Sequence, residues 1–415
     1  MSLLHLRFFF SMAFAAGSPF ILSSLSHAQP DVGLAKPAIV TPEKTSVAGA
    51  APPPTEEVKT IPGMPPVLNP KNIYSETSGP EKLSPIVAHD LKRVYVPNLR
   101  GNSVSVIDQA SFKVVDSFKV GRSPQHVVPS WDLRHLWVTN NAEGRADGSL
   151  TPIDPVTGRP GPSLPVDDPY NMYFTPDGKF AITVAEAHRR LDFREPLSMA
   201  LIGSVSTPEC SGVNHAGFSG DGRYAIFTCE FGGYLVKVDT VNRKVLGYLK
   251  LSKGGMPQDI QTAPDGHRFY VADMMADGVF IVNGDRFEET GFIPTGVGTH
   301  GEYISRNSKL LYVANRGSHK IHGPKNGPGS VSVIDLATDK VIKNWPIPGG
   351  GSPDMGNVSA DGRYLWLSGR FDDVVYAIDT QTGAVRKIPV GLEPHGLTVW
   401  PQPGRYSLGH TGILR

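Results

Sequence analysis

The chain has 415 residues, and its 40 Lys and Arg residues against 39 Asp and Glu residues leave a formal net charge of +1. Such an even charge balance provides no broad basic field, on which unaided nucleic-acid binding depends. We therefore expect no nucleic-acid partner. Beyond the first thirty residues no apolar run approaches the ~20 residues that a membrane-spanning helix needs.

Residues 1–28 have the pattern of a secretory signal peptide. Arg7 makes the start positive, an apolar run follows, and small residues at Ser26 and Ala28 mark a cleavage site. The run is interrupted at 17–19 by Gly, Ser and Pro, which disfavours a membrane anchor. The sequence therefore predicts cleavage after Ala28 and a periplasmic or secreted protein, in a compartment where disulfides persist.

Residues 29–80 are rich in Pro, Ala, Thr and charged residues and follow neither the strand nor the helix period. Such a segment has too little apolar surface to offset the entropy lost on ordering. We therefore predict a disordered linker at 29–80, followed by a single domain at 81–415.

From residue 84 the sequence repeats with a period of roughly 40 to 45 residues, which is typical of propeller blades. In "ADGRYLWLSGRFDDVVYAIDTQTGAVRKIPVGL" an Asp-Gly turn, two β-rich runs and a Thr-containing turn alternate. The repeats predict an all-β, seven-bladed propeller with four antiparallel strands in each blade. The second strands are expected to begin near Val94, Leu136, Phe180, Tyr224, Phe269, Leu311 and Tyr364.

An additional first-strand segment, "PHGLTVWP" at 394–401, follows the seventh repeat. We expect the N-terminal and C-terminal segments to meet in one blade and close the ring. The innermost strand of that blade comes from either 84–88 or 395–400.

The motifs "RVYVPNLRGNSVSVID", "SVSVIDLATDKVI" and "EPHGL" resemble the YVTN-repeat β-propeller family, which includes YncE-like periplasmic proteins. The resemblance covers about 84 to 400 and implies the propeller architecture. It assigns no activity, because this family and its relatives include binding proteins, sugar-lactone hydrolases and haem-associated domains.

One rim of the channel is expected to collect polar side chains from every blade. The start of each first strand and the end of each second strand lie on this rim, and their candidate ligand residues are His126, Asn171, Glu186, His188, Arg190, His215, Asp259, His300, Arg316, Asp354, Arg370 and His395. Buried polar groups commonly do no more than satisfy a hydrogen-bond partner. The candidate metal ligands are His126, His215, His300 and His395, provided that the blades hold them close enough to share an ion.

The segment "EAHRRLDFREP" at 186–196 supplies His188 and Arg190 to this set. Its basic side chains predict either an anion-binding edge or a solvated loop whose charges pair with one another.

The chain has two cysteines, and both belong to the first hairpin of the fourth blade. Cys210 precedes the first strand and Cys229 ends the second, so antiparallel pairing puts them at the same end of the hairpin. In an exported chain this predicts a disulfide. The alternative is a soft-metal site with His215 and Met274 or Met275, which suits Cu(I).

Three functions agree with these features, and the first is a monomeric, non-enzymatic binding or scaffold protein. It would hold a small molecule, a cofactor or an envelope protein at the rim, with no cofactor as the default. The second is a metal-dependent lactonase-like hydrolase or lyase in which Asn171, Asp259 and Glu186 or Asp354 hold Ca²⁺, with His215 or His300 as the base. The third is a redox accessory protein that binds copper or haem at the histidines; covalent c-type haem is excluded because CxxCH is absent.

Overall fold

The computed structural model describes residues 58–253, 255–410 and 414–415. The expected signal peptide and the part of the expected linker before residue 58 lie outside these residues. Within them, no helix has the length and apolar character needed to cross a membrane.

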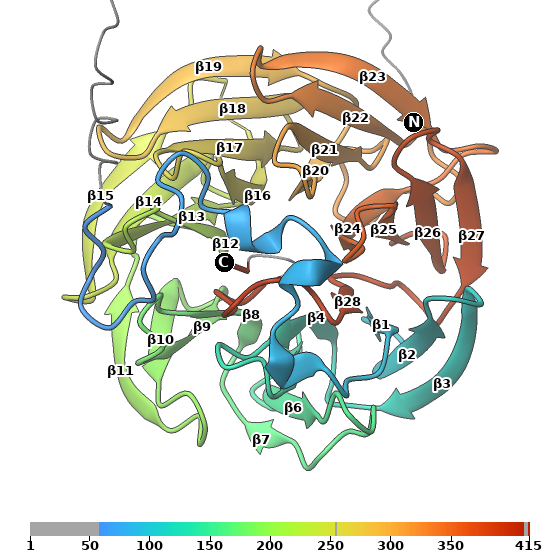
Figure 1. Ribbon diagram of the computed structural model, residues 1–415, viewed down its shortest axis with the longest axis horizontal. Helices are drawn as coiled ribbons and strands as arrows, with labels where there is room; N and C mark the ends of the chain where they lie inside the picture. Colours follow the sequence, from blue (N-terminus) through green and yellow to red (C-terminus); the bar gives the residue numbers. More distant parts are fainter. Residues whose placement is uncertain (1–57, 254, 411–413) are drawn as a thin grey trace, which may run out of the picture. The chain divides into compact units, whose positions relative to one another are not determined.

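Seven four-stranded antiparallel sheets form a ring around a central axis, which is called the channel below (Figure 1). The innermost strands surround this axis, and their residues are largely buried. The first four blades, each given from the innermost strand outwards, are β28 (Thr398–Trp400), β1 (Arg93–Asn98), β2 (Ser103–Asp108) and β3 (Lys113–Lys119); β4 (Pro124–Pro129), β5 (Leu136–Asn140), β6 (Ser149–Ile153) and β7 (Leu164–Pro165); β8 (Pro169–Phe174), β9 (Ala181–Ala185), β10 (Arg190–Arg194) and β11 (Leu201–Ser206); β12 (Val213–Phe218), β13 (Tyr224–Cys229), β14 (Tyr234–Asp239) and β15 (Lys244–Lys250). The remaining three are β16 (Pro257–Thr262), β17 (Arg268–Asp273), β18 (Gly278–Asn283) and β19 (Glu288–Pro294); β20 (Thr299–Ile304), β21 (Leu310–Asn315), β22 (Ser330–Asp335) and β23 (Lys340–Pro346); β24 (Pro353–Val358), β25 (Tyr364–Gly369), β26 (Val374–Asp379) and β27 (Val385–Pro389). The predicted seven-bladed propeller is confirmed.

The first blade is closed by the C-terminal part of the chain. Strand β28 pairs antiparallel with β1, with Trp400 opposite Arg93 and Thr398 opposite Tyr95. Residues Pro85–Val87 form the short 3-10 helix η3 instead of a strand. The innermost strand therefore comes from 395–400, which decides between the two segments that the sequence left open.

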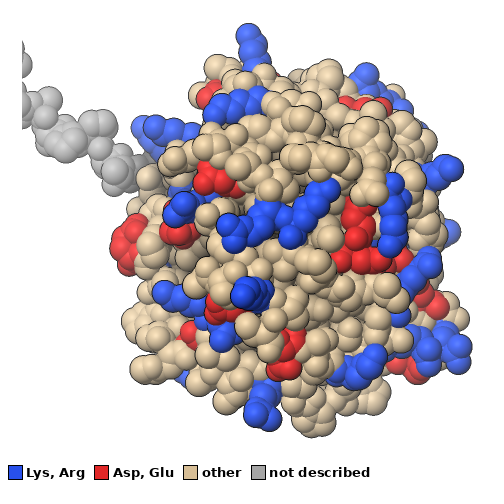
Figure 2. All heavy atoms as spheres, turned by 90° about the vertical axis from the view of Figure 1, so that its right-hand side faces the viewer, with Lys and Arg blue, Asp and Glu red and all other residues tan. Residues whose placement is uncertain are grey.

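The hydrophobic core lies between neighbouring blades. Strands such as β12 and β13 are buried along their whole length, whereas the outermost strand β3 is largely exposed. Between the third and fourth blades, for example, Phe193 packs in one cluster with Phe227 and Val236. On the side of the ring shown in Figure 2, basic and acidic side chains lie among one another.

Both terminal segments cover the face of the ring that lies opposite the rim, where the innermost strands end. The N-terminal segment includes the 3-10 helices η1 (Ser75–Thr77) and η2 (Pro80–Lys82), and crosses the middle of the ring (Figure 1). Its Ile73 N–H donates to the Pro264 carbonyl at 2.9 Å, and the Tyr74 hydroxyl donates to the Thr262 carbonyl at 2.7 Å. Residues 58–80, which the sequence assigns to the linker, are therefore packed on the ring. A few apolar side chains suffice to anchor them.

Candidate functional site

A β-bulge recurs near the start of six innermost strands, β4, β8, β12, β16, β20 and β24. In each, the pairing register with the second strand shifts next to the first residue of the innermost strand. A bulge inserts one unpaired residue and re-aims the side chains around it. The second residues are Gln125, Tyr170, Asn214, Gln258, His300 and Asp354, and the third residues are His126, Asn171, His215, Asp259, Gly301 and Met355.

Three imidazoles meet in the channel and form what we call the histidine cluster, made of His126, His215 and His410. The ring centroids of His126 and His215 are 5.3 Å apart, and those of His410 lie 4.8 and 4.6 Å from them. One potential ligand atom from each residue lies within 4.8 Å of the other two. All three side chains are buried.

Neighbouring groups hold these rings in place. The amide nitrogen of Asn171 lies 3.2 Å from Nδ1 of His215 and 3.1 Å from Nδ1 of His410. Asp259 Oδ1 lies 3.6 Å from Nε2 of His410. Gly396 has to be glycine, because a Cβ atom there would overlap the ring of His126.

The imidazoles of His126 and His215 are neutral at neutral pH. Burial and the neighbouring histidines, above all His410, lower the pKa of each well below its ordinary value. A neutral imidazole offers a nitrogen lone pair, which a cation can use. Both ring nitrogens of His126 and Nε2 of His215 have no hydrogen-bond partner among the described residues.

Asp354 is the centre of a second group that is held together by charge. It accepts two hydrogen bonds from Arg316 at 3.0 and 3.1 Å, and its Oδ1 lies 2.7 Å from Nδ1 of His300. Burial would raise the pKa of Asp354, yet Arg316 and His300 hold it well below the usual range. Burial and Arg316 lower the pKa of His300 to about 4. The carboxylate of Asp354 is thus ionised and paired with the guanidinium of Arg316.

Two carboxyl groups face each other nearer the rim. Burial and the facing Glu230 raise the pKa of Glu186 well above its ordinary value, and burial also raises the pKa of Glu230. The amide of Asn214 donates to Glu230 at 2.7 Å. The pair therefore favours holding a proton at pH values where isolated carboxyls are ionised.

The structure brings the residues expected at the rim to the channel, with two exceptions. His188 is exposed and lies 3.4 Å from Asp167, and Arg190 on β10 pairs with Asp167 and Asp192. Their loop turns away from the channel, so their charges pair with each other as the solvated-loop alternative expects. The four histidines expected as metal ligands divide into two groups, with His126 and His215 in the histidine cluster and His300 and His395 beside Asp354.

Two buried residues of the channel were missed from the sequence, His410 and Glu302. His410 follows the last repeat, so the repeat register does not place it, although "GRYSLGH" is conspicuous after the closing strand. Glu302 lies three residues after the first residue of β20, one position beyond those compared between blades.

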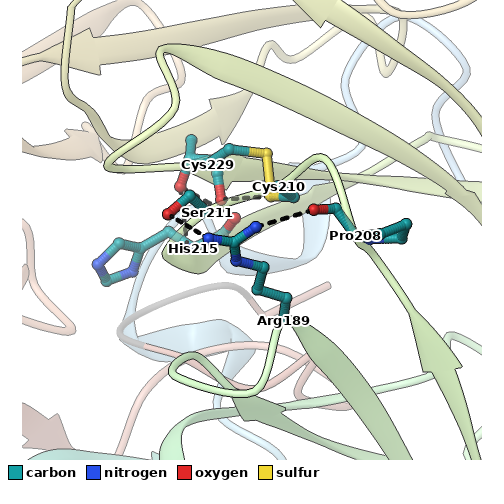
Figure 3. Close-up of a disulfide and its surroundings, with 7 residues drawn as sticks. Arg189, Pro208, Cys210, Ser211, His215 and Cys229 are labelled. Carbon is teal, nitrogen blue, oxygen red and sulfur yellow. Dashed lines mark hydrogen bonds between the residues drawn. A yellow bond between two sulfur atoms is a disulfide. The ribbon is translucent and has the colours of Figure 1, made fainter.

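The predicted disulfide between Cys210 and Cys229 is confirmed, with 4.8 Å between the Cα atoms (Figure 3). It ties the segment before β12 to the end of β13, and the side chain of His215 extends away from the bridge. The alternative soft-metal site made from these thiols is therefore wrong. Met274 is buried with its sulfur 3.5 Å from Arg316, and Met275 is half exposed.

The family model for the YNCE-like beta-propeller matches residues 95–403. Among curated proteins, YncE of Salmonella typhi is 26% identical over 146 residues, which are 34% of this chain. The match spans 38% of that relative's length.

Solved structures with low sequence identity share the fold. The periplasmic gluconolactonase PpgL of Pseudomonas aeruginosa has a TM-score of 0.60 and 18% identity, over 74% of this chain and 98% of that one. The hydrazine synthase of Kuenenia stuttgartiensis has a TM-score of 0.54 and 16% identity, over 65% of this chain and 87% of that one. The extent of the family match, together with the seven closed blades, shows that this chain belongs to the YNCE-like beta-propeller family.

Proposed function

We propose that this protein is a binding protein of the cell envelope that holds a small ligand inside its channel. The signal-like segment at 1–28 supports the envelope location, and the polar innermost strands support the place of binding.

The observation that carries this proposal is a set of buried polar atoms without partners. Among the described residues, both ring nitrogens of His126 and His395 and Nε2 of His215 accept or donate no hydrogen bond. Leaving a buried polar group unpaired costs about 1–3 kcal/mol. A bound ligand offers these atoms the partners that the protein does not.

Access to this ligand is proposed from the rim alone. The terminal segments lie across the opposite face, where the backbone of His410 donates to the Met172 carbonyl at 3.1 Å. On the rim side, the ring centroid of Tyr170 lies 5.5 Å from that of His126 and 6.0 Å from that of His215.

A lactonase-like hydrolase is the second candidate, since the fold is shared with a periplasmic gluconolactonase. Two features place it behind binding. Asp354, one of the expected Ca²⁺ ligands, is engaged by Arg316. Asn171 and Asp259 lie among imidazole nitrogens, whereas Ca²⁺ prefers oxygen ligands.

Native mass spectrometry of the mature protein, purified from its own envelope fraction, tests the proposal. We expect a mass above that of the denatured chain, and a loss of this difference in His126→Ala but not in His319→Ala, which removes an exposed histidine. Equal native and denatured masses would contradict the proposal. Turnover of sugar lactones by the same sample, abolished by His215→Ala, would favour the hydrolase.

A further inference from the structure

We infer that the ligand of the channel is a transition-metal ion bound by His126, His215 and His410, and that the C-terminal segment completes its site. This inference rests on the proposed function and names the chemical class of the ligand. It requires that the three imidazoles form a suitable donor set and that the segment carrying His410 is docked.

The geometry of the histidine cluster suits one ion. Two imidazole nitrogens bound to one tetrahedral ion at ~2.0–2.1 Å lie about 3.4 Å apart. The potential ligand atoms of His126, His215 and His410 already lie within 4.8 Å of one another, so small ring rotations bring them into contact with an ion. Imidazole ligands suit zinc, copper, iron and nickel.

Asp259 lies next to His410, outside the set of three histidines whose ligand atoms lie within 4.8 Å of one another. Its Oδ1 lies 3.6 Å from Nε2 of His410 and accepts the backbone N–H of Ile260 at 2.9 Å. Its other oxygen accepts the backbone N–H of Glu302 at 3.0 Å, which fixes the direction of the carboxylate. One carboxylate among neutral imidazoles also supplies the negative charge that favours a cation.

Asn171 has the position of an outer partner of the ligands. Metal-binding histidines usually donate their second ring N–H to a nearby acceptor, which orients the ring. The side-chain amide of Asn171 contacts Nδ1 of both His215 and His410, so ligation through Nε2 leaves both Nδ1–H groups facing it. The Asn171 oxygen accepts the backbone N–H of Met172 at 2.8 Å, so presenting it to the two Nδ1–H groups takes half a turn of the amide and gives up this bond.

The second group in the channel, His300, His395 and Asp354, is a poorer cation site. Arg316 forms two hydrogen bonds to Asp354, and Arg370 lies 4.0 Å from it. Two guanidinium groups beside the only carboxylate of the group repel a cation and compete for its ligand oxygen. The charge distribution therefore favours the histidine cluster.

The segment after β28 carries His410 into the channel and is held there by the backbone of β8 and β12. The Phe174 N–H donates to the Leu408 carbonyl at 3.0 Å, and the Arg415 guanidinium donates to the Phe218 carbonyl at 2.7 Å. Gly409 has a φ of +96° and lies against the backbone of Tyr173, which only glycine permits. An ion shared with His126 and His215 would thus link this segment to two blades.

Titration of the full-length, chelator-stripped protein with Co²⁺ alone tests the inference, because tetrahedral Co²⁺ has a strong visible absorption. We expect one equivalent to bind and the melting temperature to rise. Asn171→Ala, which removes an outer partner of the ligands, is expected to weaken Co²⁺ binding by 10- to 100-fold. His126→Ala and His410→Ala each remove a ligand and are expected to weaken Co²⁺ binding by more than that. His319→Ala is the matched control and is expected to bind as the wild type does.

Unchanged Co²⁺ affinity in His126→Ala and His410→Ala, with circular dichroism confirming that both are folded, would overturn the inference. If either variant fails to fold, the same test uses Asp259→Asn, at the carboxylate beside His410, and Asn171→Ala, at the outer partner of the ligands. An organic molecule retained in native mass spectra of a protein that binds no Co²⁺ would defeat the inference and leave the proposed function standing. No Co²⁺ binding and no retained mass would defeat both.

Discussion

Glu302 is a buried carboxyl group of the channel that lies beside the carboxylate of Asp259 and the backbone of Gln261. Burial, and then the nearby carboxylate of Asp259, raise the pKa of Glu302 well above its ordinary value of 4.5. The folded protein therefore keeps this proton at pH values where the unfolded chain has lost it. The stability that the proton contributes is complete below about pH 4.5 and is lost as the pH rises through the folded-state pKa.

We predict that Glu302→Gln stabilises the metal-free protein at neutral pH, because glutamine keeps the shape of the protonated acid without its ionisation. The gain in the free energy of unfolding over the wild type is expected to be small at pH 4 and to exceed about 1 kcal/mol at pH 8, since one pKa unit corresponds to about 1.4 kcal/mol. Urea unfolding at several pH values measures it. Glu288→Gln, at an exposed carboxyl paired with Arg286, serves as control. A gain that does not grow with pH would contradict the raised pKa.

The repeat register was sufficient to find most of the channel residues from the sequence. His126, Asn171, His215 and Asp259 occupy the same place in successive repeats, and one structural rule places all of them. His410 lies outside the repeats, and its position depends on long-range contacts of the C-terminal segment. His188 and Arg190 were placed by their nearness to the end of β9, but the turn between β9 and β10 directs them to Asp167.

The β12–β13 hairpin carries His215, and the disulfide between Cys210 and Cys229 covalently links the segment before β12 to the end of β13. The bridge joins residues 19 apart, and the bulge between its ends leaves the His215 N–H bound to the Thr228 hydroxyl at 3.0 Å. The bridge therefore restrains the part of β12 whose pairing is irregular.

We predict that replacing both cysteines, Cys210→Ala with Cys229→Ala, lowers the free energy of unfolding by about 3 kcal/mol, as expected for a bridge that closes a loop of this size. Co²⁺ binding is expected to weaken as well, because His215 loses its fixed position. Urea unfolding of the wild type with and without reductant gives the same comparison without a substitution. Identical unfolding midpoints in oxidised, reduced and substituted protein would contradict a stabilising role.

Local signals account for how well the strands were predicted. Asp-Gly pairs lead into β13, β17 and β25, and Gly222, Gly266 and Gly362 have φ values of +80°, +77° and +74°. Because these turns demand a residue that tolerates positive φ, they mark the hairpins in the sequence. Each second strand begins within one residue of its expected start.

The arrangement of the two terminal segments on the ring was not accessible to such local reasoning. The choice of β28 as the closing strand depends on pairing between residues about three hundred positions apart, such as Arg93 and Trp400. Residues 58–80 have few apolar residues and no period, yet Ile61, Ile73 and Tyr74 are buried by the ring that they cover. Their order is a property of the assembled molecule and not of the segment.

The C-terminal segment gives the last prediction, because one buried leucine holds it against the third and fourth blades. Leu408 is fully buried in a cluster with Tyr173 and Tyr406. Leu408→Ala is expected to cost about 2–5 kcal/mol, the range for a leucine truncated in a packed core. Leu392→Ala, at an exposed leucine, is the matched control and is expected to change stability by less than about 0.5 kcal/mol.

Limited trypsin digestion at Arg405 then separates loss of the segment from loss of the ring. Arg405 is only partly exposed while the segment is docked, with its N–H bound to the Arg415 carbonyl at 2.7 Å. If the C-terminal segment detaches while the ring stays folded, Leu408→Ala speeds cleavage after Arg405 and lowers the Co²⁺ affinity by displacing His410. The strand signal in circular dichroism then persists. If cleavage after Arg405 becomes faster only when the strand signal is lost, the segment and the ring unfold as one unit. The C-terminal segment is then an integral part of the fold and does not detach separately.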